Sequence, residues 1–484
     1  MGQGSTPPTD RPPQCVAGRS EQPRRRLKLD RSPDVVETGR AAPLTTTAPR
    51  RPTLCIDGYN IAMTRGTGIA TYGRNLLTTV RALGFETQVL YGPPRKRSKR
   101  PLLNETALVD AERPRKNKRI ARYVQTLTSR AGVPAWPVTP SGEVFWPTRA
   151  GGRPDAASFW AAHDLYYRAN RSFSAYRKET PVDFDTDGGA GKPDLMHWTA
   201  TLPLHARGVP NVYTIHDLIP LRLPHTTLDD KPAYFALCRA IARRADHIAV
   251  VSETTRQDVI RMLGVSEDRV TNTYQAVHLP AALTNRSEAD VTRELQGVFD
   301  LGWKDYFLHF GAIEPKKNLG RVVEAYLASG CLTPLVVVGG RAWLDEPETA
   351  LMNQVIADKG PSAERIRRYE YLPFSMLISL IRGAKATLFP SLYEGFGLPV
   401  LESMALGTAV LTSTGGSLPE VAGDAAISVD PYDVPALTRG LQALDADDAL
   451  REDLERRGRI QAAKFSVEAY RARLAEVYSR VGVS

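Results

Sequence analysis

The segment from Ala386 to Gly407 constrains the fold more than any other part of this sequence. It opens with a short apolar run, residues 386–389, which is typical of a buried strand. Gly395 and Gly397 then allow a tight turn, and Pro399 suits the first position of a helix. A buried strand, a glycine turn and a helix in this order predict an α/β fold with a ligand-binding turn at the strand end.

Two carboxylates lie in this segment, Glu394 in the turn and Glu402 in the helix. A helix N-terminus suits a phosphate, but carboxylates beside it would repel one. They are better suited to accept hydrogen bonds from neutral hydroxyls, such as those of a sugar and a ribose. The alternative is that neither carboxylate binds a ligand. Glu394 would then be an ordinary loop residue, and Glu402 a first-turn acid favoured by the helix dipole.

Strands and helices alternate on both sides of a polar stretch at residues 283–297, which is typical of parallel sheets covered on both faces. We therefore predict an α/β fold of two Rossmann-like, doubly wound domains that face each other across a cleft. In the first half we expect strands at 53–57, 87–90, 195–199, 212–215 and 247–251, and helices at 69–83, 230–244 and 254–263. In the second half we expect strands at 306–310, 335–338, 366–369, 386–389 and 409–412, and an amphipathic helix from Leu319.

The domain organisation follows from composition. Residues 1–50 hold eight prolines and few large apolar residues, so we expect a disordered tail. Residues 51–295 are expected to form an amino-terminal Rossmann-like domain, with residues 92–160 as a basic insertion on its surface. Residues 296–465 are expected to form a second Rossmann-like domain, and residues 466–484 a helix that packs back on the first domain.

The net charge of +10 is confined to two segments. Residues 1–50 hold nine basic and five acidic residues, and residues 92–122 hold eleven and three. The remaining chain is nearly neutral, so we expect no nucleic-acid partner. The basic clusters of residues 92–122 have two interpretations: a solvated loop, or a surface that makes peripheral contact with anionic lipid.

The sequence predicts a cytoplasmic protein. If the basic clusters contact anionic lipid, the protein would be peripherally bound to the inner face of the membrane. No apolar run approaches the roughly 18 residues that span a bilayer, and the N-terminus has no apolar core of a secretory signal. Four widely spaced cysteines indicate free thiols in a reducing compartment, and no metal-ligand spacing is present.

A second motif in the carboxyl-terminal half carries cations. A strand at 306–310 runs into Gly311, and Lys316 and Lys317 follow where a helix begins. This placement opposes the helix dipole, and a bound anion would reverse that penalty. The alternative is a solvated pair of surface lysines. Nearby, Gly415 and Gly416 form another glycine turn, which could offer N–H groups to a diphosphate.

The amino-terminal half offers two candidate sites. Gly66 and Gly68 follow the first strand, but without the full dinucleotide fingerprint. They still permit a close approach of the backbone to a phosphate. His216 and Asp217 end the strand at 212–215, where a side chain would point into the cleft; a structural role for the histidine is the alternative.

In combination these motifs resemble the retaining glycosyltransferases of family 4, which have the GT-B fold, and in style they are similar to bacterial mannosyltransferases. Glu394 and Glu402 match the family's E-x7-E pair. The G-x-x-E-P-x-K-N-L pattern falls at residues 311–319, and S-L-P-E-V-x-G-D-A-A at residues 417–426. The patterns G-x-G-I-x-x-Y and T-x-H-D of the first half are also present.

The resemblance implies that residues 51–295 form the acceptor-side domain and that residues 296–465 form the nucleotide-sugar-binding domain. It also implies roles for matching positions. Glu394 would hold donor-sugar hydroxyls, Glu402 the ribose, and Lys317 the diphosphate leaving group, while His216 would contact the sugar. Glu394, Lys317 and His216 are thus the expected catalytic residues. The other expected substrate-binding residues surround them: Gly66, Gly68, Asp217, Gly311, Lys316, Gly395, Phe396, Gly397, Leu398, Gly415 and Gly416.

The implied activity is transfer of a hexose from GDP- or UDP-hexose, with retention of configuration, to a glycan or lipid-linked acceptor in cell-surface polysaccharide or lipopolysaccharide synthesis. No cofactor or metal is expected, because lysine and backbone dipoles serve the leaving group. Many family members carry an arginine where this chain has Ala312, and those lacking it often use GDP-mannose, which favours mannose here. Alternatives are a GT-B-fold epimerase or phosphorylase, and a non-catalytic adaptor. A phosphorylase would be expected to carry a pyridoxal-phosphate lysine site, and this sequence has no recognisable one.

Overall fold

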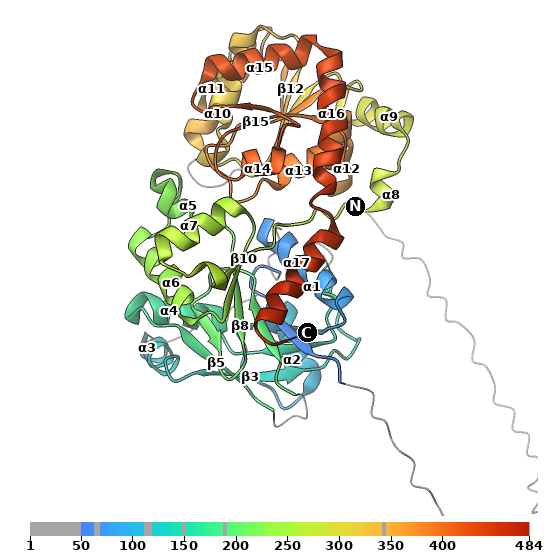
Figure 1. Ribbon diagram of the computed structural model, residues 1–484. Helices are drawn as coiled ribbons and strands as arrows, with labels where there is room; N and C mark the ends of the chain where they lie inside the picture. Colours follow the sequence, from blue (N-terminus) through green and yellow to red (C-terminus); the bar gives the residue numbers. More distant parts are fainter. Residues whose placement is uncertain are drawn as a thin grey trace, which may run out of the picture. The chain divides into compact units, whose positions relative to one another are not determined.

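The computed structural model describes residues 50–61, 68–110, 119–147, 152–186, 191–340 and 345–483. Residues Arg51–Ser484 form one compact unit, which carries all of the described helices and strands. This unit contains two sheets, and we call the parts built on them the first lobe (β1 to β10) and the second lobe (β11 to β16) (Figure 1).

The sheet of the first lobe has ten described strands in the order β10-β9-β8-β6-β1-β2-β4-β3-β5-β7. All described pairs are parallel except β3 with β4, so the sheet is mixed rather than wholly parallel as predicted. The strands are β1 (Thr53–Asp57), β2 (Glu86–Tyr91), β3 (Val133–Val138), β4 (Ser158–Ala161), β5 (Thr180–Phe184), β6 (Leu195–Trp198), β7 (Leu204–Ala206), β8 (Asn211–Ile215), β9 (His247–Val250) and β10 (Val270–Asn272).

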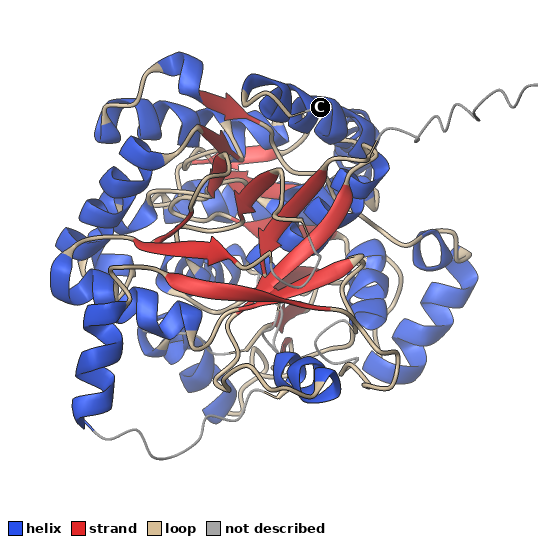
Figure 2. Ribbon diagram, turned by 90° about the horizontal axis from the view of Figure 1, so that it is seen from below, coloured by secondary structure: helices blue, strands red, loops and turns tan. Residues whose placement is uncertain are grey.

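Helices cover this sheet, as the blue ribbons around the red strands show in Figure 2. They are α1 (Gly68–Ala82), α2 (Pro101–Val109), α3 (Arg119–Thr128), α4 (Leu165–Tyr176), α5 (Ile219–Arg222), α6 (Lys231–Arg244) and α7 (Glu253–Leu263). Local sequence fixes the start of the last two. Asp230 and Ser252 are N-caps whose side chains accept hydrogen bonds from the N–H groups of Ala233 and Thr255.

The second lobe has a six-stranded sheet, parallel in all described pairs, in the order β13-β12-β11-β14-β15-β16. Its strands are β11 (Phe307–Phe310), β12 (Leu335–Val338), β13 (Ile366–Tyr369), β14 (Ala386–Phe389), β15 (Ala409–Ser413) and β16 (Ile427–Val429). Because all strands point one way, the turns after β11, β14 and β15 lie at one edge. The chain thus carries two α/β lobes, as the strand–turn–helix pattern predicts.

The helices of the second lobe follow the predicted periodicity. α10 (Leu319–Ser329) buries Leu319, Val322, Val323 and Tyr326 along one face, as the spacing of its apolar residues predicts. The other α-helices that follow β10 in the chain are α8 (Ala281–Thr284), α9 (Glu288–Phe299), α11 (Glu346–Ala357), α12 (Phe374–Gly383), α13 (Leu398–Ala405), α14 (Leu418–Ala422), α15 (Val434–Ala446), α16 (Asp448–Ala463) and α17 (Val467–Arg480).

The prediction that residues 92–160 form a surface insertion was wrong for two parts of the segment. Residues 133–138 and 158–161 are β3 and β4, which join the sheet beside β2. Phe159 and Trp160 are among the most buried side chains of the lobe. The segment therefore contributes to the core, and Trp136 and Trp160 lie in β3 and β4.

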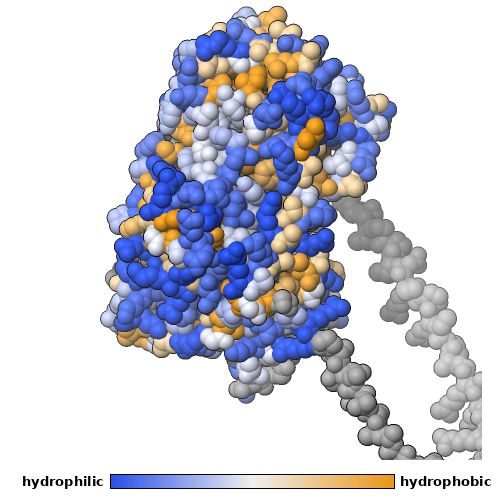
Figure 3. All heavy atoms as spheres, in the orientation of Figure 1, coloured by the Kyte–Doolittle hydropathy of each residue, from blue (hydrophilic) through white to orange (hydrophobic). Residues whose placement is uncertain are grey.

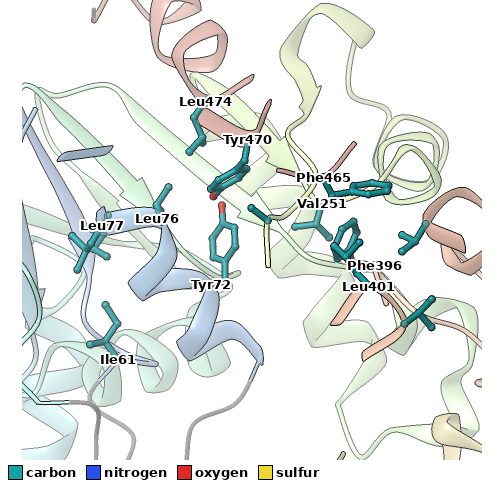
Figure 4. Close-up of a cluster of buried hydrophobic side chains, with 14 of the residues drawn as sticks. Ile61, Tyr72, Leu76, Leu77, Val251, Phe396, Leu401, Phe465, Tyr470 and Leu474 are labelled. Carbon is teal, nitrogen blue, oxygen red and sulfur yellow. The ribbon is translucent and has the colours of Figure 1, made fainter. Parts of the chain in front are cut away.

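The last helix, α17, packs against α1 of the first lobe, and Figure 4 shows the aromatic residues involved. The rings of Tyr72 in α1 and Tyr470 in α17 lie 6.5 Å apart. Tyr478 lies farther along α17, and its hydroxyl is 2.9 Å from Nδ1 of His197 in β6. Figure 4 also shows Phe396 and Phe465 packed together, so this part of the core extends to the turn after β14.

Candidate active site

Two glycine turns of the second lobe pack directly against each other. A Cβ on Gly415 or Gly416, after β15, would collide with backbone atoms of the turn after β14; for Gly416 these include the nitrogen of Glu394 at 2.8 Å. Ser417 Oγ donates to the carbonyls of Glu394 at 3.0 Å and Phe396 at 2.6 Å. The second turn therefore supports the first, which carries Glu394.

That Gly415 and Gly416 bind a diphosphate through their N–H groups stays a prediction. One of their N–H groups already has a partner in the protein, since Gly415 N–H donates to Ser413 Oγ at 3.2 Å. Two other predicted glycines have backbone angles that favour glycine: φ is +110° at Gly397, the N-cap of α13, and +124° at Gly311, after β11. Both turns thus need glycine for their shape.

Glu394 and Lys317 form a buried ion pair. Lys317 Nζ lies 2.6 Å from Glu394 Oε1, and the two side chains are 14% and 10% exposed. Burial alone would raise the pKa of Glu394, but the ammonium groups of Lys317 and Lys316 together hold the pKa below its usual value. Glu394 is therefore an ionised acceptor inside the protein.

Lys316 also lies among carboxylates. Its Nζ is 3.4 Å from Glu314 Oε1. Burial would lower the pKa of Lys316, but Glu394, Asp217 and Glu314 raise the pKa above the usual lysine value. Two ammonium groups thus lie at the turn after β11, and one of them is electrostatically coupled to Asp217 of the first lobe.

Glu402 differs from Glu394 in its charge environment. It lies on α13, and burial raises the pKa of its carboxyl to about 7, with Lys317 opposing the shift. A carboxyl that titrates near neutrality can accept hydrogen bonds from neutral hydroxyls when ionised. This property fits the predicted ribose contact and differs from that of an ordinary exposed first-turn acid.

His216 follows β8 and is held in one tautomer. Its Nε2 lies 2.8 Å from the carbonyl oxygen of Thr199, which can only accept, so Nε2 carries the proton and Nδ1 is an acceptor. The ring of Tyr72 meets the imidazole edge-on, with centroids 4.8 Å apart. Burial lowers the pKa of His216, although the Thr199 carbonyl and the Asp217 carboxylate oppose this shift. The imidazole is therefore neutral near pH 7.

The structure brings the two predicted half-sites into contact. A Cβ on Gly395 would collide with the carbonyl oxygen of His216 and lie 2.8 Å from Cβ of Asp217. Thr255 Oγ1 is within hydrogen-bonding range of the carbonyls of His216 at 3.2 Å and Gly395 at 3.4 Å. The end of β8 and the turn carrying Glu394 are therefore immediate neighbours.

The remaining predicted residues have different placements. Gly68 begins α1, and a Cβ on it would lie 4.0 Å from Leu398 Cδ1, so this helix start faces the second lobe. Phe396 is 4% exposed and its side chain lies in the core, so its backbone is the part available to a substrate. Gly66 lies outside the described residues, and its predicted role stays a prediction.

Sequence reasoning missed several contacts that join the lobes at this site. Tyr393, beside Glu394, donates its hydroxyl to Asp258 Oδ2 of α7 at 2.6 Å. Glu420 of α14 accepts hydrogen bonds from the N–H groups of Glu253 at 2.9 Å and Thr254 at 3.0 Å, the first two residues of α7. Glu420 belongs to the 417–426 pattern, so the sequence marked it as part of a motif. The pattern did not indicate that Glu420 contacts α7.

Comparisons with known proteins agree with this geometry. Two family models match the chain: "Glycosyltransferase Family 4" over residues 66–279 and "Glycosyl transferases group 1" over residues 299–461. O-antigen chain mannosyltransferase B of Escherichia coli is 33% identical over 267 residues, covering 53% of this chain and 67% of that protein. Serotype-specific mannosyltransferase WbdA of E. coli is 33% identical over 275 residues, covering 55% of this chain but 33% of that protein.

A solved structure of the HepE protein of Anabaena, in complex with UDP and glucose, aligns with a TM-score of 0.59 at 13% identity. The alignment covers 89% of this chain and 100% of that chain, so the fold is shared. The chain belongs to glycosyltransferase family 4 and has the GT-B fold.

Among the described residues, no helix combines the length and the apolar character needed to cross a bilayer.

Proposed function

We propose that this chain is a retaining glycosyltransferase that moves mannose from GDP-mannose to a glycan or lipid-linked acceptor in cell-surface polysaccharide synthesis. The observation that carries the proposal is the buried Lys317–Glu394 pair at 2.6 Å, in a turn adjoining His216. Lys317 would supply a cation for the leaving diphosphate, and Glu394 a carboxylate for sugar hydroxyls.

The proposed role of the two lysines is to stabilise the negative charge of the leaving diphosphate. Cleavage of the sugar–phosphate bond builds negative charge on the diphosphate, and a preorganised cation in a buried site stabilises that charge strongly. Lys317 would supply it, with Lys316 next to it in the chain. Lys317 is paired with Glu394 in this structure, so donor binding would share or exchange this partner.

The carboxylates and the histidine would position the donor. Glu394 is ionised and would accept hydrogen bonds from sugar hydroxyls, while Glu402 would accept them from the ribose. Neutral His216 presents Nδ1 as an acceptor on the other side of the contact. Retention would follow from attack on the face that the diphosphate leaves, with the departing phosphate taking the acceptor's proton.

Mannose is the proposed sugar because two relatives matching over half of this chain are named as mannosyltransferases. The chain's Ala312 and its sequence Glu-Pro-Lys-Lys at residues 314–317 favour GDP-mannose for the reason given by the family resemblance. The HepE structure holds UDP and glucose, which supports a nucleotide sugar as the class of donor.

The acceptor has a candidate subsite in the first lobe. A cavity of ≈ 210 Å³ adjoins the carboxyl ends of β1 and β2, and Tyr59, Tyr91, Trp146 and Tyr166 line it with Asp164. Aromatic faces pack against the C–H faces of sugars, and a few polar groups fix orientation in such pockets. Among the described residues, the buried Nε1 of Trp146 has no hydrogen-bond partner, and it is suited to donate to an acceptor hydroxyl.

A donor hydrolysis screen tests the proposed function. The full chain would be incubated with GDP-mannose, GDP-fucose, UDP-glucose and UDP-galactose, and nucleotide diphosphate release would be measured without added acceptor. We expect release from GDP-mannose above the other donors, and its loss in Lys317→Ala. Equal release from all four sugars would reject the choice of donor, and no release from any, with or without mannosides as acceptors, would reject the activity.

A further inference from the structure

A second hollow in the first lobe is lined mainly by basic side chains. It has a volume of ≈ 1040 Å³ and lies among the ends of α3, α4 and α6 and the strands β5 and β7. Six cationic side chains line it, against the single carboxylate of Glu179. They are Arg130, Arg177, Lys178, Arg207, Arg243 and Arg244.

Internal ion pairs neutralise only part of this charge. Arg244 pairs with Glu179 at 3.2 Å, Arg207 pairs with Asp183 at 2.9 Å, and Arg177 pairs with Asp230 at 4.0 Å. Within the described part of the chain, neither Lys178 nor Arg243 has an acidic partner within 4.0 Å. Arginines at the end of α6 gain from the helix dipole, but this local effect does not explain the charges that come from β7 and from α3.

Two polar groups in the hollow have pKa values shifted mainly by burial. His205 is 8% exposed and lines the hollow, and no described residue hydrogen-bonds to its Nδ1. Burial, with Arg244 and Arg207 nearby, lowers the pKa of His205 to about 4. Burial raises the pKa of Glu179 despite its pairing with Arg244, and its Oε1 also has no partner among the described residues.

The hollow is separate from the proposed donor site. Arg243 and Arg244 end α6 just before the amino end of β9, whereas His216 follows the carboxyl end of the parallel neighbour β8. A strand of four or five residues spans about 15 Å, so the two sites lie at opposite edges of the sheet. In Figure 3, hydrophilic residues dominate the surface over α4 and α6.

We propose that this hollow binds a phosphate-bearing ligand, with Arg243, Lys178 and Arg130 supplying free charge and His205 a buried hydrogen-bonding group. Guanidinium groups suit phosphate oxygens because their planar N–H donors match them in pairs. The phosphate can belong to a soluble polyphosphate or to a lipid headgroup. The proposal is independent of the donor site and of the transferase activity.

Binding of two probes tests the proposal and separates the sources. Inositol hexakisphosphate would be titrated into the full chain by calorimetry, and phosphatidylglycerol vesicles would be used for flotation, with phosphatidylcholine vesicles as the neutral reference. Arg243→Glu should weaken binding of the effective probe at least tenfold. Arg239→Ala, an exposed arginine one turn earlier on α6 that does not line the hollow, should change it less than twofold.

The histidine gives a second readout. In an NMR titration, the pKa of His205 should rise when the effective probe is bound, because an anion stabilises the protonated imidazole. Lys317→Ala should leave this shift intact, since Lys317 follows β11 in the second lobe and does not line the hollow. The proposal is overturned if neither probe binds at low salt, if Arg243→Glu and Arg239→Ala bind equally, or if the pKa of His205 does not move.

Discussion

Lys317 Nζ and Glu394 Oε1 lie 2.6 Å apart although their residues are 77 positions apart in the chain. The pair joins the turn after β11 to the turn after β14, which are neighbouring strands of the second sheet. Both groups are largely shielded from water, so removing one charge leaves the other with weaker compensation in a buried position. Substitutions in this pair therefore test its effect on the free energy of unfolding and on turnover in the same variants.

Lys317→Ala should lower turnover by about two to three orders of magnitude, the effect of losing one preorganised group at a developing oxyanion. It should also lower the free energy of unfolding, because breaking a buried pair costs about 3–5 kcal/mol. The control is the double variant Lys317→Met with Glu394→Gln, which removes both charges. It should regain stability but not turnover, and unchanged turnover in the single variant would reject the assigned role.

Glu402 should make the protein's behaviour depend on pH. Its folded pKa of about 7 lies above the ordinary value of 4.5, so its stabilising contribution is complete below pH 4.5 and is lost as the pH rises through 7. Each pKa unit corresponds to about 1.4 kcal/mol. Between pH 5 and 8 the wild type should therefore lose stability relative to Glu402→Gln, as thermal unfolding in matched buffers would show.

The same residue predicts the pH dependence of donor binding. If an ionised Glu402 accepts the ribose hydroxyls, the dissociation constant for the donor should fall as the pH rises from 6 to 8. In Glu402→Gln the dissociation constant should be flat over this range. If the dissociation constant had the same pH dependence in the two proteins, Glu402 would not be the residue that binds the ribose. The stability prediction would not be affected by this result.

Glu420 gives a prediction about the contact between the lobes. Its carboxylate accepts the first two N–H groups of α7, and Ser252 accepts the third from Thr255, so the first three helical N–H groups all have side-chain acceptors. Glu420→Ala should cost about 1–2 kcal/mol, as loss of a helix cap does. The control is Asp424→Ala, an exposed carboxylate, which should stay within about 0.5 kcal/mol. Equal thermal midpoints for the two variants would contradict this account.

The sequence predicted those elements whose signals are local. The strand at 386–389, its glycine turn and the stripe of α10 need only neighbouring residues for their identification, and all are present. β3 and β4 were missed because prolines and basic runs surround them, and their pairing depends on partners far along the chain. Tertiary packing overrode local propensity there.

The site divides in the same way. Motif spacing located Glu394, Lys317 and His216, and the structure places them in adjoining segments. No pattern could show that Glu420 would cap α7, 167 positions earlier, or that Tyr393 would reach Asp258. Such contacts depend on how the two lobes pack against each other. The spacing of apolar residues within the strands and helices of one lobe carries no information about that packing.

Gly395 provides the final prediction, because it lies where the lobes touch. A Cβ there would collide with the His216 carbonyl and crowd Asp217, and these are backbone and near-backbone atoms that cannot move alone. Gly395→Ala should therefore displace the turn with Glu394 from His216 and lower turnover at least tenfold. The control is Gly297→Ala in α9, where a Cβ meets nothing within 4 Å. It should keep full turnover and gain up to about 1 kcal/mol from helix propensity. Circular dichroism would confirm that both variants are folded, and full activity of a folded Gly395→Ala protein would show that this contact between the lobes is not needed for catalysis.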